Sequence, residues 1–266
     1  MADQSNIAML IDADNSPASR IEEVLDELAK YGVINIRRAY GNWKSPSLKG
    51  WEAVLHDYAI RPIQQFAYSK GKNATDMAMC VDAMDLLYSN ALDGICLVSS
   101  DADFTPLVMR IRANGLIVIG FGEKKTPTPF VNACSKFLYL ETLADIESGD
   151  SSIATSSESS GDSQAKAVAP PPPVTPSPRQ DGKILRGDTR LTNLLRKAVE
   201  AAADDDGWAA LGGVGSHIAK QASFDPRNYG YAKLKDLFVA VGLFDMREVN
   251  KAVYVRDKKH QTANSK

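Results

Sequence analysis

The sequence predicts an α/β protein, with a parallel sheet between two layers of helices, followed by a second, small winged helix-turn-helix domain. Through the first 140 residues, short apolar runs alternate with amphipathic segments. A stretch rich in Ser, Pro, Asp and Gly follows, and the remainder carries three helical patterns and a hairpin pattern. Strand–helix alternation is typical of doubly wound parallel sheets. A chain of 266 residues suits one medium and one small domain.

Continuous apolar runs mark the strands of the first domain, because strands buried on both faces consist of unbroken hydrophobic segments. The predicted strands are 7–11, 33–40, 60–67, 94–100 and 116–121, with a short edge strand at 137–140. Apolar residues at helical spacing predict helices between them, including one from Thr105 to Ala113. Ser16 is predicted to cap the first helix, with Pro17 at its first position.

Composition sets the expected domain boundaries. Residues 148–182 include four consecutive prolines and few apolar side chains, so they are predicted to form a disordered linker. We therefore expect the first domain over 1–147, the winged helix over 183–258 and a flexible tail over 259–266. The pattern from Phe244 to Arg256 predicts the hairpin wing.

Charge is distributed unevenly between the two domains. Residues 1–147 carry five more acidic than basic side chains, whereas residues 183–266 carry five more basic than acidic ones. This asymmetry suits an acidic module that a basic one holds to a polyanion. Cys80, Cys96 and Cys134 show no zinc-binding spacing and are expected in the core. No segment resembles a signal peptide or a membrane span, so a cytoplasmic protein is expected.

Carboxylates gather where the predicted strands end. Asp12 follows the first strand, and Asp101 and Asp103 follow the fourth. Asp76 lies in the first turn of the helix after the third strand. Ligands of parallel α/β sheets bind at the carboxyl ends of the strands, near the point where the strand order reverses. Three segments that are distant in the chain are therefore expected to bring carboxylates to one edge of the sheet.

Carboxylates this close together repel one another unless a cation lies among them. Oxygen ligands without His or Cys favour Mg²⁺ or Mn²⁺, which activates water and stabilises an in-line displacement at phosphorus. The predicted metal ligands are Asp12, Asp76 and Asp101, and with Asp103 they form the predicted catalytic set. The supporting residues are Asn15 and Ser100, which would orient water or ligands, and Lys70 and Lys72, which would hold phosphates. The alternative is that some of these carboxylates, Asp14 and Asp76 above all, only cap helices.

Three ordered strings in the first domain resemble the NYN domain, the LabA-like branch of the PIN-like nuclease superfamily. They are "AMLIDADNSP", "KGKNATDMAMCVDAMDLL" and "ICLVSSDADFTPLVMRIRANG", and the resemblance covers residues 5–143. It implies a parallel α/β/α sandwich whose acidic residues bind a divalent metal for RNA hydrolysis. The positions that match the acidic motifs are Asp12, Asp76, Asp101 and Asp103, and Asn15 matches the polar residue after the first Asp.

The second domain resembles the OST-HTH or LOTUS domain over Asp188–Arg256, most specifically in "VGSHIAKQ" and "FDPRNYGYAKLKDLF". The resemblance implies a winged helix associated with RNA binding. The predicted RNA contacts are Arg227, Lys233 and Lys235 at phosphates, and Tyr229 or Tyr231 in a stack on an unpaired base. The alternative is that one tyrosine packs in the core and the lysines are solvated surface residues.

These features together predict a ribonuclease that depends on Mg²⁺ or Mn²⁺, cuts as an endonuclease and is delivered to RNA by its winged helix. A linker of this length would keep the basic module at a high effective concentration near the active site. The alternative function is a non-catalytic RNA-binding regulator, with RNA or a protein as the ligand of the winged helix. A phosphatase of the haloacid-dehalogenase type is disfavoured, because Asn15-Ser16-Pro17 stands where that mechanism needs an apolar run and Thr. A receiver domain is disfavoured too, because no Asp follows the third strand.

Overall fold

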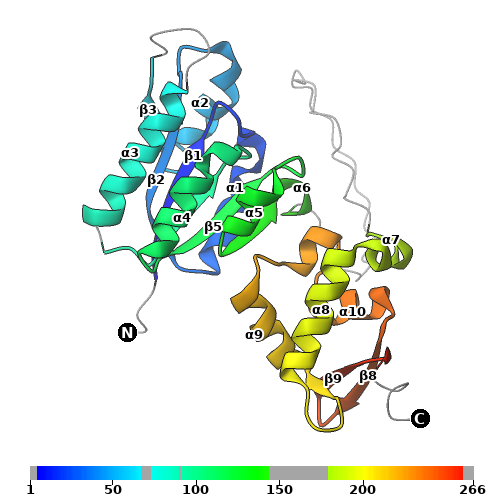
Figure 1. Cartoon of the computed structure of the whole chain (residues 1–266). Helices are drawn as coiled ribbons and strands as arrows, with labels where there is room; N and C mark the ends of the chain where they lie inside the picture. Colours follow the sequence, from blue (N-terminus) through cyan, green and yellow to red (C-terminus); the bar gives the residue numbers. More distant parts are fainter. Residues whose placement is uncertain (1–4, 67–72, 90, 144–178, 260–266) are drawn as a thin grey trace, which may run out of the picture.

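The computed structural model describes residues 5–66, 73–89, 91–143 and 179–259, which form two domains (Figure 1). The sheet of the first domain has the strand order β3-β2-β1-β4-β5-β6, and all neighbouring strands are parallel. Its strands are β1 (Asn6–Asp12), β2 (Val33–Gly41), β3 (Arg61–Gln64), β4 (Gly94–Val98), β5 (Ile117–Gly122) and β6 (Lys136–Tyr139). The strand order reverses between β1 and β4, which is where such sheets open a crevice for ligands.

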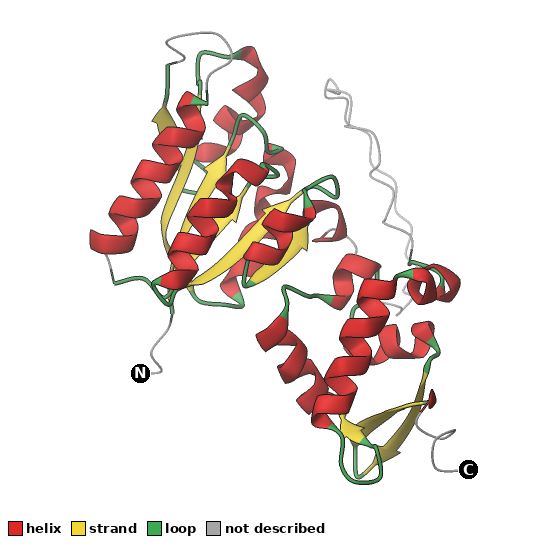
Figure 2. Ribbon diagram, in the orientation of Figure 1, coloured by secondary structure: helices red, strands yellow, loops and turns green. Residues whose placement is uncertain are grey.

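Helices cover both faces of this sheet, as predicted (Figure 2). They are η1 (Ala18–Arg20), α1 (Ile21–Ala29), η2 (Pro46–Leu48), α2 (Lys49–Leu55), α3 (Ala74–Ser89), η3 (Ala102–Phe104), α4 (Thr105–Ala113), α5 (Thr128–Ala133) and α6 (Leu140–Leu143). Alternate side chains of β1 serve the two cores, because successive residues of a strand point to opposite faces. Met9 and Ile11 pack with α1 and α2, whereas Ala8 and Leu10 pack with α3 and α4. The predicted α/β/α sandwich is confirmed.

The predicted start of the first helix was wrong. Pro17 precedes the short helix η1, no side chain caps it, and α1 begins only at Ile21. The Ser16 hydroxyl instead donates to the carbonyl of Val98 at 3.1 Å, and the Trp51 indole donates to the carbonyl of Ser16 at 2.9 Å. Ser16 thus connects the segment after β1 to β4 through its hydroxyl and to α2 through its carbonyl. Local sequence does not reveal these contacts.

The second domain is a small helical bundle with an antiparallel sheet in the order β7-β9-β8. Its elements are α7 (Gly182–Gly187), α8 (Thr189–Ala202), β7 (Ala209–Ala210), α9 (Leu211–Gln221), η4 (Pro226–Tyr229), α10 (Leu234–Val241), β8 (Phe244–Val249) and β9 (Ala252–Asp257). The three predicted helices are α8, α9 and α10, and β8 and β9 form the predicted wing. The helix α7 begins at the last residue of the expected linker, and the rest of that linker up to residue 178 lies outside the described residues.

The three cysteines lie in the core or against it. Cys96 and Cys134 are buried, Cys80 is half-buried, and all three are free thiols. Their predicted place in or against the core is confirmed. Among the described helices, none combines the length and the apolar character that a membrane span requires.

The two domains meet along β6, the last strand of the sheet. The side-chain amide of Asn228 donates to the carbonyl of Phe137 at 2.9 Å and accepts from the backbone N–H of Tyr139 at 3.2 Å. The Asn228 side chain therefore pairs with the backbone groups of β6 in the way that a neighbouring strand would. An open strand edge would otherwise be a site of unwanted pairing with other chains. The second domain thus covers part of the β6 edge.

A buried ion-pair network holds the same interface. The Arg227 guanidinium donates to both carboxylate oxygens of Glu27 at 2.7 Å and to both of Asp225 at 2.9 Å. Lys136 forms a further ion pair with Asp225 at 3.0 Å, and the Tyr31 hydroxyl donates to Glu27 at 3.0 Å. The Glu27 carboxylate is almost wholly buried. Because a buried charge is costly without a partner, Glu27 depends on the docked position of the second domain.

Acid is expected to weaken this interface. Burial raises the pKa of Glu27, but hydrogen bonds from Arg227 and Lys30 outweigh it and lower the pKa from 4.5 to about 2. A carboxyl group with a lowered folded-state pKa contributes stability that is complete above its ordinary pKa and is lost as the pH falls through the folded-state pKa. The free energy of docking should therefore decrease as the pH falls from about 4.5 to about 2.

Small-angle scattering of the full chain at stepped pH measures this change as an increase in the radius of gyration. Glu27→Gln removes the titrating group and should flatten the pH dependence. A radius that rises in the same way for Glu27→Gln would assign the transition to other carboxylates.

Candidate active site

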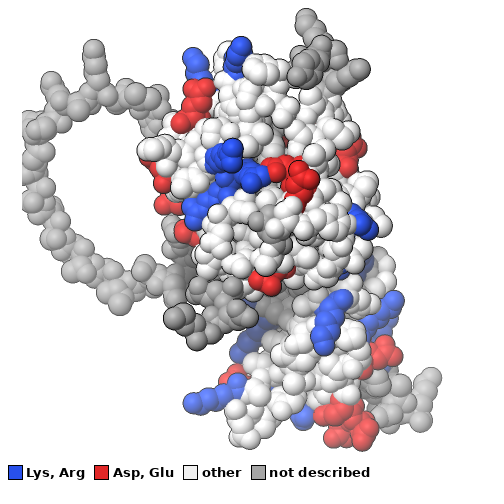
Figure 3. Space-filling model, turned by 90° about the vertical axis from the view of Figure 1, so that its left-hand side faces the viewer, with Lys and Arg blue, Asp and Glu red and all other residues white. Residues whose placement is uncertain are grey.

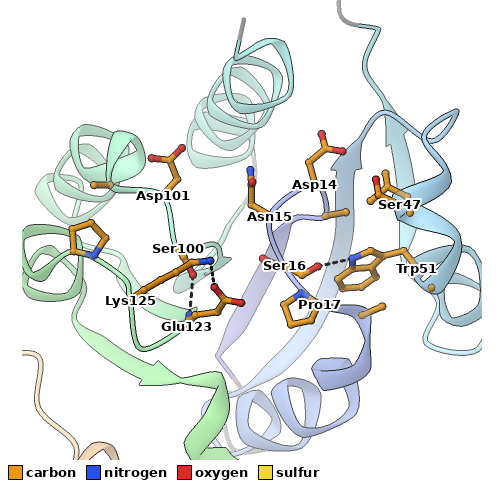
Figure 4. Close-up of a pocket in the computed structure, with 16 residues that line it drawn as sticks. Asp14, Asn15, Ser16, Pro17, Ser47, Trp51, Ser100, Asp101, Glu123 and Lys125 are labelled. Carbon is orange, nitrogen blue, oxygen red and sulfur yellow. Dashed lines mark hydrogen bonds and ion pairs between the residues drawn. The ribbon is translucent and has the colours of Figure 1, made fainter. Parts of the chain in front are cut away.

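A pocket of about 690 Å³ lies at the carboxyl ends of β1, β4 and β5. Figure 4 shows Asp14 and Asp101 on opposite sides of this pocket, with Asn15 between them. The neighbouring strands β1 and β4 contribute these residues, because the chain leaves both strands at the point where the strand order reverses. The pocket therefore occupies the edge of the sheet that the sequence predicted.

Asp12 is the last residue of β1, and its side chain is fully buried next to the pocket. It accepts hydrogen bonds from the Asn15 amide at 3.1 Å and from the Ser99 hydroxyl at 3.0 Å. Burial raises the pKa of Asp12 to about 6, and the charges of Asp76 and Asp14 contribute to the rise against these two hydrogen bonds. A buried carboxyl group with a raised pKa at such an edge is a candidate functional group.

The electrostatic environment of Asp76 depends on the other predicted carboxylates. Burial raises the pKa of Asp76, in the first turn of α3, and the charges of Asp101, Asp103 and Asp14 raise it further. Asp76 directly follows Thr75 in the chain, and the hydroxyl of Thr75 donates to the Asp14 carboxylate at the pocket. Of the predicted carboxylates, Asp101 lines the pocket and Asp12 is buried next to it, whereas Asp76 and Asp103 are not among its lining residues; Asp14 lines it as well.

Asp14 does more than cap a helix. One of its oxygens accepts from the Thr75 hydroxyl at 2.9 Å and the other from the backbone N–H of Asn42 at 3.3 Å. The side chain therefore connects the end of β1 to the start of α3 and to the end of β2. Asp101, in contrast, does cap the short helix η3, where it accepts from the backbone N–H of Asp103 at 2.8 Å. Asp101 therefore both caps η3 and lines the pocket.

Ser99, rather than the predicted Ser100, contacts Asp12. Ser99, which the sequence analysis did not select, donates to Asp12 and accepts from the backbone N–H of Asp101 at 3.1 Å. Ser100, the predicted supporting residue, lines the pocket, but its hydroxyl accepts from the backbone N–H of Glu123 at 2.8 Å. Ser99 therefore joins the two acidic strand ends, while Ser100 holds the end of β5.

Glu123 and Lys125 also line the pocket, and the sequence analysis missed both. Their side chains form an ion pair, which Figure 4 shows on the Asp101 side of the pocket. The signal for Glu123 was present, because it directly follows the buried strand β5 as Asp12 and Asp101 follow or end theirs. Lys125 is a cation at the rim, whereas the predicted phosphate contacts Lys70 and Lys72 lie outside the described residues.

The predicted RNA contacts of the second domain separate into two groups. Arg227 is held between Glu27 and Asp225, and Tyr231 is buried with its hydroxyl donating to the carbonyl of Gln180 at 2.7 Å. Neither is available in this conformation for the role expected of it, because the interface and the core already use these groups. Tyr229 packs against Phe224. Lys233 and Lys235 are exposed, and Lys235 lies 3.3 Å from Glu248.

The donor set of the pocket suits a hard divalent cation. All its potential charged ligands are carboxylates. Besides burial, neighbouring carboxylates raise the pKa of Asp12 and of Asp76, and a cation would relieve this repulsion. The carboxylates are spread around the pocket, however. Within the described ranges, no three His, Cys, Asp or Glu side chains are grouped tightly enough to form a ready-made ion site. The chemistry and charge of these residues fit such a metal, although their present arrangement is not a ready-made site.

A second hollow, between β2, β3 and α3, has a different character. It measures about 610 Å³ and is lined by Arg38, Arg61, Asp82 and Asp85 together with apolar side chains of α3. Figure 3, which views the molecule from the side of α3, shows basic side chains directly beside acidic ones. Arg38 and Asp82 form an ion pair there. Because these charges neutralise one another, this face offers little attraction to a polyanion.

Comparison with known proteins gives two family matches. A model described as the NYN domain matches residues 6–141, and one described as the OST-HTH/LOTUS domain matches residues 185–256. An uncharacterized protein of Methanocaldococcus jannaschii, MJ0482, is 31% identical over 125 residues, which are 46% of this chain and 49% of that protein. The chain thus spans about half the length of this curated relative.

Two solved structures are also similar to this chain. The crystal structure of VPA0982, a protein of unknown function from Vibrio parahaemolyticus, covers 52% of this chain and 94% of its own at 19% identity and a TM-score of 0.44. The solution structure of an uncharacterized protein from gene locus NE0665 of Nitrosomonas europaea covers 36% of this chain and 92% of its own. Its identity is 33% and its TM-score is 0.26.

Proposed function

Because the chain belongs to the NYN domain family and carries an OST-HTH/LOTUS domain after it, we propose that it is a divalent-metal-dependent ribonuclease that cuts RNA internally. The NYN domain belongs to the PIN-like nuclease superfamily, and OST-HTH/LOTUS domains bind RNA. The single observation that carries the proposal is that Asp14, Asp101 and Glu123, at the ends of β1, β4 and β5, line one pocket next to the buried Asp12.

In this proposal Asp12, Asp76 and Asp101 hold Mg²⁺ or Mn²⁺. Such an ion supplies an activated water and offsets negative charge on the phosphate. Asn15 and Ser99 hold the Asp12 carboxylate in one orientation through their hydrogen bonds. Residues of this kind behind a metal ligand support affinity and activity strongly.

Asp103 and Lys125 have simpler roles in this proposal. Asp103 orients water beside Asp101, whose carboxylate accepts a hydrogen bond from the backbone N–H of Asp103. Lys125, exposed at the rim, neutralises a phosphate that flanks the cleaved bond.

A second function is favoured by the spread of the carboxylates around the pocket. Since no three acidic side chains of the described ranges form a ready-made ion site, a non-catalytic RNA-binding regulator is the competing proposal. Both functions use RNA as the ligand, and they differ only in the chemistry at the sheet edge.

Incubation of the full chain with mixed RNA separates the two. We expect fragments with Mn²⁺ or Mg²⁺ and none with a chelator, because a carboxylate cluster without a cation repels the phosphate backbone. The matched control is the same chain with the metal but with Asp12→Asn. Undiminished cleavage in the chelator would refute the metal-dependent mechanism, and intact RNA under all conditions would leave the regulator.

A further inference from the structure

The outer face of the sheet in the second domain carries aromatic and guanidinium groups that the proposed function does not yet use. Arg247 of β8 and Ala210 of β7 both pair with Tyr254 of β9. Side chains alternate between the two faces of a strand, and Val255 is fully buried in the core of the domain. Its neighbours Tyr254 and Arg256 therefore face outward, together with Arg247.

Trp208, directly before β7, joins this face and contacts both arginines. The guanidinium of Arg247 lies 4.1 Å from the centroid of the Trp208 ring, and that of Arg256 lies 4.5 Å from it. Arg247 also lies 5.6 Å from the centroid of the Tyr254 ring. These four residues are called the wing cluster below. Because the contacts already hold the flat groups in place, a flat ligand that stacks on them loses less conformational entropy on binding.

Arg247 retains hydrogen-bonding capacity for a ligand. It is exposed, and it makes no hydrogen bond or ion pair with any other residue in the part of the chain that the structure describes. A guanidinium that contacts a ring through its face keeps N–H groups at its edge for a phosphate. Lys251 adds a second exposed cation at the turn between β8 and β9, where Asn250 and Lys251 have φ values of 50° and 66°.

The other basic groups of this domain are less suited to RNA. Arg227 is enclosed by the interface with the first domain, and Lys235 faces the carboxylate of Glu248. The helix α9 contains Lys220 as its single Lys or Arg, and three of its positions are Gly. Arg190 is exposed near Phe224 and Tyr229, but its guanidinium donates to Asn132 of the first domain. The wing thus combines exposed cations with aromatic rings away from the interface with the first domain.

We propose that the wing cluster is the RNA-binding site of the second domain and that it takes unpaired bases. The bases stack on the layer that Trp208, Tyr254 and the guanidinium planes form together, and Arg247 and Lys251 contact the adjoining phosphates. A single strand exposes the faces of its bases, whereas a duplex hides them between neighbouring pairs. The assignment rests on the proposed function only in taking RNA as the ligand.

The test is the affinity of the full chain for a fluorescently labelled single-stranded RNA of about 12 nucleotides, a length that such surfaces cover. The measurement is made in a chelator, so that binding is read without cleavage. Trp208→Ala should weaken binding about 10-fold or more, as the loss of one base stack predicts. Arg247→Ala should weaken it about 5-fold and reduce the salt dependence by the equivalent of one phosphate contact.

Lys197→Ala is the matched control, because it removes an exposed positive charge from α8, outside the wing cluster. Arg247 is exposed, so its removal tests the site even where Trp208→Ala destabilises the domain. Unchanged affinity in Arg247→Ala, or equal affinity of the wild type for a duplex of the same length, overturns the assignment. So does a wild type that binds no RNA, which would favour a protein ligand for this surface.

The test of RNA binding at the wing cluster and the test of RNA cleavage can fail independently. A chain that cleaves RNA with Mn²⁺ but binds it equally well after both substitutions would remove the wing site and leave the nuclease. Loss of binding in the two variants, in a chain that never cleaves RNA, would support the wing site and remove the nuclease.

Discussion

Asp101→Asn is expected to lower metal-dependent cleavage of RNA by more than about 100-fold, the loss that follows when one charged group is removed from a preorganised site. The fold should survive, because the amide oxygen of Asn can still accept from the backbone N–H of Asp103 and cap η3 as Asp101 does. Binding of RNA should not weaken, since the substitution removes a negative charge that repels phosphate. Cleavage of a labelled RNA with Mn²⁺ and its binding in a chelator measure the two effects.

Asp85→Asn is the matched control for this experiment. It makes the same chemical change at an exposed position of α3, on the helix that also carries Asp76. Its cleavage rate should equal that of the wild type. Full activity in a purified Asp101→Asn protein, free of contaminating nucleases, would contradict the assignment of the pocket.

Arg227→Ala is expected to release the second domain from the β6 edge. Breaking one partner of a buried ion pair costs about 3–5 kcal/mol. Here two carboxylates lose their guanidinium partner at once, and Glu27 keeps Lys30 while Asp225 keeps Lys136. The chain can avoid leaving these charges buried by exposing Glu27 to water, so the loss should appear as undocking rather than as unfolding of either domain. Small-angle scattering should show a larger radius of gyration, and thermal unfolding should divide into two transitions.

Lys233→Ala serves as the control for undocking, because it removes a positive charge from an exposed residue near Arg227 in the chain. Glu27→Gln should produce a smaller effect than Arg227→Ala, since Arg227 keeps its hydrogen bonds to Asp225. An Arg227→Ala protein with the dimensions and the single transition of the wild type would show that the apolar contacts of the interface are sufficient alone.

Much of the acidic site followed from a local rule. A carboxylate at the end of a buried parallel strand, or a few residues after it, lies at the ligand-binding edge, as Asp12 and Asp101 do. The same rule applied to β5 would have identified Glu123. Ser99 was harder to find, because its importance lies in the hydrogen bonds to Asp12 and Asp101 rather than in any sequence pattern.

The second domain shows where local reasoning fails. Its segment around η4 carries Arg227 and two tyrosines, a composition typical of an RNA-binding surface. In the structure Arg227 binds Glu27, a residue that is distant in the chain, and Tyr231 fills the core. The outward face of the wing, where Trp208 contacts two arginines, was not identified. The hairpin of β8 and β9 was predicted, but β7 and Trp208 join β9 only in the folded domain.

The amino-acid sequence alone predicted the two domains, most of their helices and strands, and the carboxylates at one edge of the sheet. These properties follow from periodicity and from residues adjacent in the chain, which act over one or two turns of backbone. The partners of the charged groups came from the folded molecule only. A buried Arg takes whichever carboxylate the packing brings within about 3 Å, and no spacing in the sequence encodes a meeting between α1 and η4.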